Sequence, residues 1–285
     1  MPKKLMSTEP HVVDIIEYNE RELKDKEVLV ETEYASGKHG TTVAMFDNVN
    51  FKGQNFDQNM RLFVKNDSEN NEEYSLELGT TGTGTVVKTG KKVSQWKPGD
   101  KVFGLMKVRE TNICQEDDLW ELDDINPLEA LCIEPGYVSF HCIREGKVRF
   151  GDTVAVIGLG AIGLISVQMA HKSGASRVIA VDPLALRRKT AKKLGADQVL
   201  NPETDNIGLK IHQLTDKRGV DVAIEASGEY EGLNSAIKAT RNCGTVCAAG
   251  FYQGEADNLW LGREMHHNRL DLVIPHGCGW GHPPR

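Results

Sequence analysis

The sequence of 285 residues is long enough for about two domains of roughly 150 residues, and 39% apolar residues can fill a substantial core. With 41 acidic and 34 basic side chains the formal charge is −7, which repels a phosphate backbone, so we expect no nucleic-acid partner. The most apolar stretch, residues 153–167, is shorter than the roughly 20 residues of a bilayer span, and the N-terminus lacks the apolar run of a signal peptide. We therefore expect no membrane association and a cytoplasmic location.

Six cysteines are scattered along the chain without a Cys-x-x-Cys pair. This distribution argues against a disulfide framework and against a zinc ribbon. We expect most of these cysteines to be free thiols.

Short β-rich runs separated by turn residues occupy the first part of the chain. They cover residues 11–18, 26–34, 82–90 and 101–106. This spacing predicts a small antiparallel barrel or sandwich. Between Met45 and Glu77 the sequence is polar and rich in Asn and Asp, which predicts one or two long surface loops.

After residue 130 the pattern becomes strand, turn and helix, repeated. The predicted strands cover residues 153–160, 177–182, 197–200, 220–228 and 245–252. The predicted helices cover residues 161–175, 184–196, 207–219 and 231–244. Continuous apolar strands separated by helices indicate a parallel sheet covered on both faces. We therefore predict an α/β fold with a β-rich domain over residues 1–130 and a doubly wound parallel sheet over residues 131–285.

A glycine-rich turn follows the first strand of the predicted parallel sheet. Its residues are Gly158, Leu159, Gly160, Ala161, Ile162 and Gly163. An apolar strand precedes the turn, a helix follows it, and Asp182 stands 19 residues beyond Gly163 at the end of the next strand. This combination is typical of a dinucleotide-binding site.

Each part of this pattern has a physical role. Gly158 permits the tight turn, Gly160 lets the backbone approach a pyrophosphate, and Gly163 lets the helix pack close to the strand. The helix N-terminus then holds the phosphates. Asp182 accepts hydrogen bonds from a ribose diol and repels a 2′-phosphate, which predicts NAD(H) rather than NADP(H), although Arg187 nearby weakens that preference.

Two later segments fit the same ligand. Ser227 and Gly250 each follow a predicted strand, at the sheet edge where open α/β sheets bind ligands. We therefore count both as cofactor-binding residues.

The whole pattern resembles the medium-chain dehydrogenase/reductase superfamily of alcohol and polyol dehydrogenases. The similar segments are residues 26–34, 78–104, 133–143, 151–182, 192–202 and 219–228, including the Lys-Pro-Gly-Asp-Lys-Val turn and Gly-Ala-Asp-Gln-Val-Leu-Asn-Pro. The resemblance implies a GroES-like catalytic domain, a Rossmann domain and a nicotinamide cleft between them. It also implies a homodimer, formed through edge strands near residues 245–252 and 271–275.

The chain departs from the family's zinc sites. Zinc-containing members carry Cys-Gly-Thr/Ser-Asp where residues 39–42 read His-Gly-Thr-Thr, and Gly-His-Glu where residues 79–81 read Gly-Thr-Thr. Glu134 stands where polyol-type members place a carboxylate on or near the metal. A catalytic zinc needs about three protein ligands, and His39 and Glu134 supply two. The four cysteines of the structural zinc lobe are also missing from residues 106–119. We therefore expect no metal.

Two further features refine the resemblance. Residues 262–269 resemble zinc-lacking members of the bacteriochlorophyllide dehydrogenase type, which favour Gly-Thr where Gly40-Thr41 stand. Family members also continue for several tens of residues and return a strand and a helix to the catalytic domain. We therefore expect a zinc-lacking subgroup and a shortened C-terminus.

Without zinc, hydrogen-bonding side chains must exchange the proton of the substrate oxygen. His39 is the best candidate, because an imidazole titrates near neutral pH. By alignment, Thr41 occupies the family's proton-relay hydroxyl position, Thr80 faces the same cleft, and Glu134 is placed to orient His39.

The resemblance thus implies an NAD(H)-dependent oxidoreductase that transfers a hydride between nicotinamide and a small alcohol or carbonyl substrate, without catalytic zinc. Two alternatives stay open. One is a zinc dehydrogenase with atypical ligands, and the other is a catalytically inactive NAD(H)-binding protein.

Overall fold

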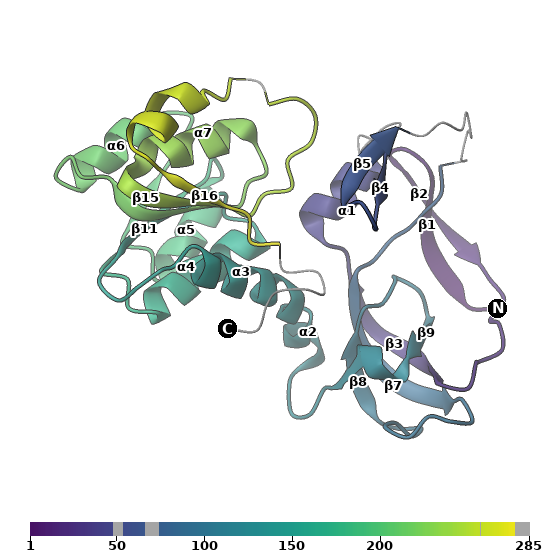
Figure 1. The fold of residues 1–285 in the computed structure, drawn as a ribbon. Coiled ribbons are helices and arrows are strands. Elements are labelled where there is room, and N and C mark those ends of the chain that lie inside the picture. Colours follow the sequence, from purple (N-terminus) through teal and green to yellow (C-terminus); the bar gives the residue numbers. More distant parts are fainter. Residues whose placement is uncertain (48–53, 66–73, 257, 277–285) are drawn as a thin grey trace. The chain divides into compact units, whose positions relative to one another are not determined.

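The computed structural model describes residues 1–47, 54–65, 74–256 and 258–276. The chain forms two units, Met1–Ile133 and Glu134–Arg285 (Figure 1). Antiparallel strands build the first unit, and a parallel sheet covered by helices builds the second. The predicted fold class is therefore confirmed. Among the described residues, no helix combines the length and the apolar character that a membrane span requires.

A five-stranded antiparallel sheet forms the centre of the first unit, in the order β10-β8-β7-β3-β9. Its strands are β3 (Glu27–Ser36), β7 (Thr81–Thr89), β8 (Lys101–Gly104), β9 (Thr111–Gln115) and β10 (Leu119–Glu121). On β3, Val28 and Val30 are two residues apart and therefore lie on the same face of the sheet, in the core. The buried cluster consists of Val28, Val30, Val86, Val102, Met106, Cys114 and Leu119.

A second antiparallel sheet, β2-β1-β6, lies at the N-terminus. It comprises β1 (Lys3–Glu9), β2 (Val12–Glu17) and β6 (Leu76–Glu77). Backbone bonds from Leu5 N to Val108 O (2.9 Å) and from Glu110 N to Lys3 O (3.0 Å) join it to the segment before β9.

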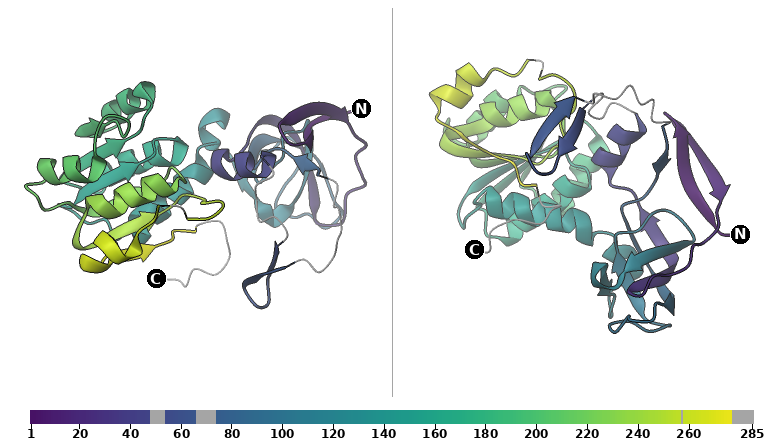
Figure 2. Two further views of the ribbon diagram at one scale, coloured as in Figure 1. Left: turned by 90° about the horizontal axis from the view of Figure 1, so that it is seen from above. Right: turned by 45° about the vertical axis from the view of Figure 1, so that its right-hand side comes forward.

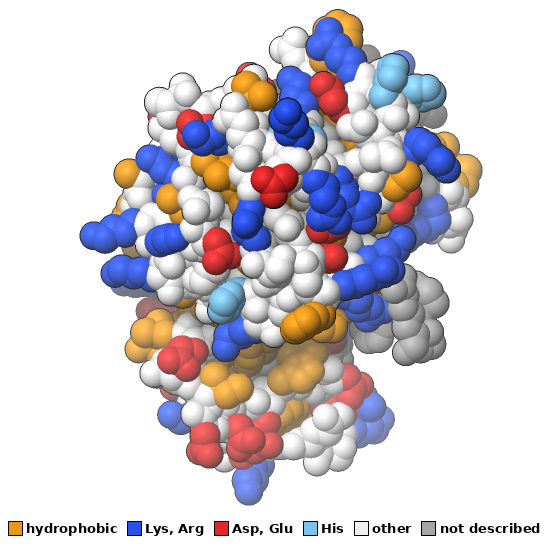
Figure 3. Space-filling view, turned by 90° about the vertical axis from the view of Figure 1, so that its left-hand side faces the viewer, with side chains coloured by type: hydrophobic (Ala, Val, Ile, Leu, Met, Phe, Trp, Pro, Cys, Tyr) orange, Lys and Arg blue, Asp and Glu red, His pale blue; other side chains and the backbone are white. Residues whose placement is uncertain are grey.

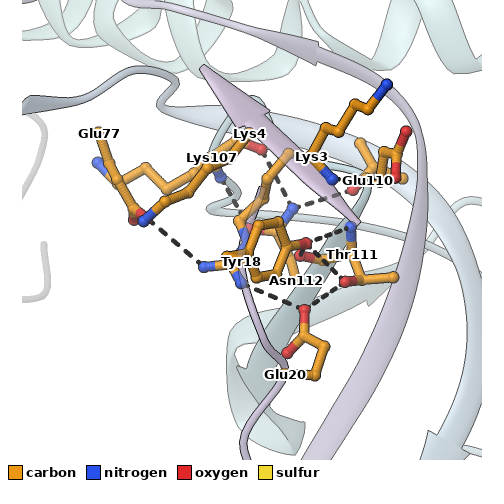
Figure 4. A network of polar contacts seen from close by, with 11 residues as sticks. Lys3, Lys4, Tyr18, Glu20, Glu77, Lys107, Glu110, Thr111 and Asn112 are labelled. Carbon is orange, nitrogen blue, oxygen red and sulfur yellow. Dashed lines mark hydrogen bonds and ion pairs between the residues drawn. The ribbon is translucent and has the colours of Figure 1, made fainter. Parts of the chain in front are cut away.

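Polar side chains reinforce this junction (Figure 4). The Tyr18 hydroxyl lies 2.7 Å from Thr111 Oγ1, and Glu20 accepts hydrogen bonds from the Thr111 hydroxyl and from Arg109. The Arg109 guanidinium lies 4.0 Å from the centre of the Tyr18 ring and 3.7 Å from Glu77. A polar cavity of about 470 Å³ lies beside these residues. Lys4 pairs with Glu77, and Arg109 pairs with Glu20 and Glu77, so the network holds the N-terminal strands in place.

The prediction of long loops between Met45 and Glu77 is wrong in part. β4 (Gln54–Asp57) and β5 (Leu62–Lys65) form an antiparallel hairpin there, and residues 48–53 and 66–73 lie outside the description. The Asp57 carboxylate accepts the N–H groups of Asn59 and Met60, each at 2.8 Å, and so closes the turn. The sequence signal is one Phe on either side of that turn, Phe56 and Phe63, which pair across the two strands.

Three short helices are found among the described residues of the first unit. They are α1 (His39–Phe46), the 3₁₀-helix η1 (Glu116–Asp118) and α2 (Pro127–Ala130). The Asn126 side chain caps α2 by accepting the N–H of Leu128 at 2.9 Å, and Pro127 fits the first helical position.

The second unit contains a six-stranded sheet in the order β13-β12-β11-β14-β15-β16, with every neighbouring pair parallel. Its strands are β11 (Thr153–Ile157), β12 (Arg177–Val181), β13 (Gln198–Leu200), β14 (Val220–Glu225), β15 (Thr240–Ala248) and β16 (Asp271–Val273). The strands are nearly continuous runs of buried residues because helices cover both faces.

Helices α6 and α7 cover one face of this sheet, and α3, α4 and α5 cover the other (Figures 1 and 2). The helices are α3 (Ile133–Glu145), α4 (Ala161–Lys172), α5 (Ala185–Lys193), α6 (Ile207–Leu214), α7 (Tyr230–Ala239) and the π-helical turn η2 (Leu261–Met265). On the first face Ile211 and Ile237 are buried against the strands, and on the second face Val138 and Val167 are. The core is therefore a layer of apolar side chains on each side of the sheet.

The end of α7 differs from the predicted helix over residues 231–244. The helix ends at Ala239 and β15 begins at Thr240. Arg241 Nε donates to Asp221 Oδ1 at 2.6 Å, which holds the chain in extended form at the start of β15. In the described sheet β15 is an internal strand and β16 is the edge strand, so the expectation of an edge strand near residues 245–252 is wrong.

Charges of both signs are interspersed on the face of the molecule shown in Figure 3. Helix α5 is an exception within the second unit, because it carries five basic side chains and no acidic one. These are Arg187, Arg188, Lys189, Lys192 and Lys193. This basic helix follows Asp182 at the end of β12.

Candidate functional site

The carboxyl ends of the parallel strands form the candidate site. β11 lies between β12 and β14. From β11 the chain first adds β12 and β13 on one side of the sheet, and then adds β14, β15 and β16 on the other side. Open α/β sheets bind ligands at such a reversal of strand order, outside the carboxyl ends of the strands. The residues that follow β11, β12, β14 and β15 are therefore the candidates for ligand binding.

The glycine turn after β11 has the shape that the sequence predicts. Gly158 has φ +83°, and a Cβ there would lie 2.7 Å from Ser227 Cα. A Cβ on Gly163 would overlap the Gly158 carbonyl oxygen, so the helix packs directly on the turn. By contrast, a Cβ on Gly160 would meet nothing within 4 Å. The backbone is thus closely packed on one side of the turn and open at Gly160.

The N-terminus of α4 follows at this open position. Gly160 is the N-cap and has no side chain to bond the first turn of the helix, while Leu164 N donates to Gly160 O at 2.9 Å. The N–H groups of Ala161 and Ile162 belong to the set that has no intrahelical partner. Together with the helix dipole they suit an anionic group such as a pyrophosphate.

Asp182 lies at the end of β12 and braces this turn. Its side chain is only 2% exposed. One carboxylate oxygen accepts the Leu159 N–H at 2.8 Å, and the other accepts the Leu184 N–H at 2.8 Å. Arg187 Nη1 lies 3.5 Å from the oxygen that binds Leu159. The structure therefore brings Asp182, Arg187 and the glycine turn together.

Ser227 and Gly250 also lie at this edge. Ala226 N donates to Ile157 O at 2.7 Å, which places the turn after β14 beside the glycine turn. A Cβ on Gly250 would lie 2.5 Å from Gly228 Cα, so the turn after β15 contacts the turn after β14. The ten residues predicted to bind the cofactor thus gather at three adjacent turns, the first turn of α4, the end of β12 and the first turn of α5.

Two residues of this edge escape the sequence-based prediction, Glu225 and Tyr252. Glu225 ends β14 with a fully buried carboxyl group, which receives the Ser227 N–H at 2.7 Å and the hydroxyls of Ser227 and Tyr252. Burial raises the pKa of Glu225, although the hydrogen bonds from Ser227 and Tyr252 act in the opposite direction. The available signal was an acidic residue directly after the apolar residues Val222–Ile224, at the carboxyl end of the predicted strand.

The predicted catalytic residues are divided between the two units. His39 and Thr41 lie in the first turn of α1, and the side chain of His39 is outside the description. Thr80 Oγ1 accepts the Lys38 N–H at 3.0 Å, so Thr80 lies at the N-terminus of α1. Glu134 belongs to the second unit, where it lies in the first turn of α3. The structure thus brings Thr80 close to the helix that carries His39 and Thr41.

Two positions of this region lack zinc-binding side chains. Residues 80 and 81 occupy positions where zinc-containing dehydrogenases carry His and Glu. Here both are threonines, which lack the imidazole, thiolate or carboxylate that zinc prefers. Within the described part of the chain, no three His, Cys, Asp or Glu side chains are grouped to hold a metal ion.

Comparison with protein families identifies both units. Residues 24–121 match the family described as alcohol dehydrogenase GroES-like domain, and residues 161–274 match the family described as zinc-binding dehydrogenase. The chain is 34% identical over 289 aligned positions to D-guloside 3-dehydrogenase of Escherichia coli (strain K12), covering 99% of this chain and 83% of that protein. It is 36% identical over 206 positions to sorbitol dehydrogenase of Bacillus subtilis (strain 168), covering 61% of this chain and 58% of that protein.

Solved structures share the fold. Galactitol-1-phosphate dehydrogenase from Escherichia coli superposes with a TM-score of 0.78 at 18% identity, covering 98% of this chain and 85% of that chain. For 2R,3R-butanediol dehydrogenase from Bacillus subtilis the TM-score is 0.76 at 23% identity, covering 97% and 84%.

The two glycines at the start of the turn give a matched pair of substitutions. Gly158→Ala should lower the free energy of unfolding by roughly 2 kcal/mol or more, because its φ is left-handed and the added Cβ meets the Ser227 backbone. Gly160→Ala should cost no more than about 1 kcal/mol, because its Cβ enters open space and Ala is only a poorer N-cap. Urea unfolding without ligand measures both. Equal losses would contradict the packing described for Gly158.

Proposed function

The chain belongs to the medium-chain dehydrogenase/reductase superfamily as an alcohol-dehydrogenase-like oxidoreductase, and we propose that it transfers a hydride between NAD(H) and a secondary alcohol or ketone of a sugar or polyol derivative. The carboxyl edge of the parallel sheet carries this proposal, because the glycine turn, the N-terminus of α4 and Asp182 lie together there. The substrate class follows from the names of the relatives, D-guloside 3-dehydrogenase and sorbitol dehydrogenase.

The preference for NAD(H) rests on the position of Asp182. Its carboxylate is fixed by the Leu159 and Leu184 N–H groups, and it keeps lone pairs that can accept from a ribose diol. A 2′-phosphate in the same place would meet a buried negative charge. Arg187, 3.5 Å from this carboxylate, reduces the repulsion but does not remove it.

The chemistry divides between the cofactor and the side chains of the first unit. When bound, the nicotinamide gives or takes a hydride at its C4 atom. The oxygen of the substrate must then gain or lose a proton, and His39 is the side chain that we assign to this transfer. Thr41 and Thr80 supply hydroxyl groups near the start of α1, and Glu134 is the fourth residue that we assign to catalysis. We assign no step to zinc.

The remaining parts of the proposal concern the organisation of the protein. We assign the substrate to residues 1–130 and the cofactor to residues 131–285. We propose a homodimer that pairs through β16, because the unpaired N–H and C=O groups of an edge strand favour pairing with a second strand. A cytoplasmic location agrees with a small-molecule substrate and a nicotinamide cofactor.

A substitution that removes the charge of Asp182 and keeps its shape tests the cofactor preference. Wild type should bind NADH more tightly than NADPH, and Asp182→Asn should reduce the ratio of the two affinities at least about fivefold, because it removes the charge that opposes the 2′-phosphate. Fluorescence titration with each nucleotide measures the ratio. Asp197→Asn is the control, since that carboxylate accepts the Val178 N–H at the other end of β12. A ratio that is the same in wild type and Asp182→Asn would contradict the assignment.

Removal of the imidazole tests the chemical step. His39→Gln should lower kcat for alcohol oxidation by about 100-fold while the affinity for NADH stays unchanged, because the substitution removes a proton carrier and leaves the second unit intact.

Wild type should keep its activity after prolonged treatment with a zinc chelator. Loss of activity on chelation, restored by zinc, would favour the zinc dehydrogenase with atypical ligands. Tight NADH binding without turnover of any sugar alcohol would favour the inactive binding protein.

A further inference from the structure

A fully buried carboxyl group joins the turns after β14 and β15. The Glu225 side chain receives hydrogen bonds from the Ser227 N–H (2.7 Å), the Gly228 N–H (3.4 Å) and the Ser227 hydroxyl, all in the turn after β14. It also receives the Tyr252 hydroxyl from the turn after β15. The backbone carbonyl of Glu225 accepts the Ala249 N–H at 2.7 Å. One residue therefore bonds both turns through its side chain and its backbone.

Close packing leaves this carboxyl group little freedom. A Cβ on Gly232, in the first turn of α7, would lie 2.7 Å from Glu225 Oε1, and a Cβ on Gly250 would lie 2.7 Å from Glu225 Oε2. The Tyr252 ring stacks on Tyr230 with ring centres 5.3 Å apart, which fixes the direction of the Tyr252 hydroxyl. Each carboxyl oxygen thus faces its own set of donors.

The position of Glu225 in the sheet indicates which half of the cofactor its turns serve. The glycine turn after β11 holds the pyrophosphate, and Asp182 after β12 holds the adenosine ribose, if the proposed function is correct. β14 and β15 lie on the opposite side of β11 from β12. A dinucleotide that crosses the reversal of strand order therefore extends its nicotinamide half over the turns after β14 and β15.

From this arrangement we infer that Glu225 is a positioning residue, which uses its buried carboxyl group to fix the turns after β14 and β15 in the shape that receives the nicotinamide half of NAD(H). The inference rests on the proposed function. A glutamate suits the position because both of its oxygens accept hydrogen bonds, whereas glutamine would turn an NH₂ group toward one set of donors. Glu225 touches no reacting atom in this assignment and acts through Ser227, Gly228 and the Tyr252 turn.

The test compares NADH with ADP, which keeps the adenosine and the two phosphates but lacks the ribose and the ring of the nicotinamide half. Glu225→Gln should lower the affinity for NADH about tenfold, the effect expected when a buried hydrogen bond to a carboxylate is lost. Its affinity for ADP should stay within about twofold of wild type, because Asp182 and the glycine turn are untouched. Tyr252→Phe removes one donor and should act in the same direction by about threefold, and it decides the question if Glu225→Gln does not fold.

Asp221→Asn is the matched control, because Asp221 is also a buried carboxylate of β14 but lies at the opposite edge. It accepts from Thr153 N at 2.9 Å and pairs with Arg218 and Arg241. Its replacement should lower the thermal midpoint and change neither affinity. The inference is overturned if both ligands lose affinity equally in Glu225→Gln and Tyr252→Phe, or if neither ligand loses affinity in these variants. Glu225 would then have only a structural role. Failure of wild type to bind NADH would instead refute the proposed function.

Discussion

The hydrogen bond from the Leu159 N–H to the buried Asp182 carboxylate is the interaction on which the carboxyl edge of the sheet depends. It joins the turn after β11 to the end of β12 at a distance of 2.8 Å, across 23 positions of sequence. Because the turn is held there, Gly158 can lie against Ser227 and Gly163 against the Gly158 carbonyl. The N-terminus of α4 is consequently presented to solvent at Gly160, where the packing is open.

Three buried carboxyl groups show how one residue type serves different purposes in one sheet. Asp182 and Glu225 lie at the carboxyl edge on either side of the glycine turn, and most of their partners are backbone N–H and hydroxyl groups of the turns themselves. Asp221 lies at the amino edge and pairs with Arg218 and Arg241. Burial alone would raise the pKa of Asp221, but these guanidinium groups and the Thr153 N–H lower it. Backbone N–H and hydroxyl groups thus supply most of the partners of Asp182 and Glu225, whereas two guanidinium groups bind Asp221.

The sequence predicts the second unit well, because its signals are local. Apolar runs, a glycine turn and an acid at fixed spacing each reflect contacts within a strand-turn-helix segment, as the contact of Gly163 with Gly158 shows. Tyr252 escaped prediction because its partner Glu225 is 27 positions away and no spacing rule connects them. The end of α7 was misplaced for a similar reason, since the bond from Arg241 to Asp221 is a tertiary contact. In the first unit the hairpin at residues 54–65 was hidden by its polar composition, although Phe56 and Phe63 pack with ring centres 5.0 Å apart.

Amide hydrogen exchange of the wild-type protein with and without NADH tests the central claim most directly, because it locates the ligand on the sheet. The account predicts slower exchange on addition of NADH in peptides that cover residues 158–163 and 226–229, with unchanged exchange at residues 215–219 on the opposite edge. Exchange that is the same at residues 158–163 with and without millimolar NADH would contradict the assignment of the carboxyl edge as the cofactor site.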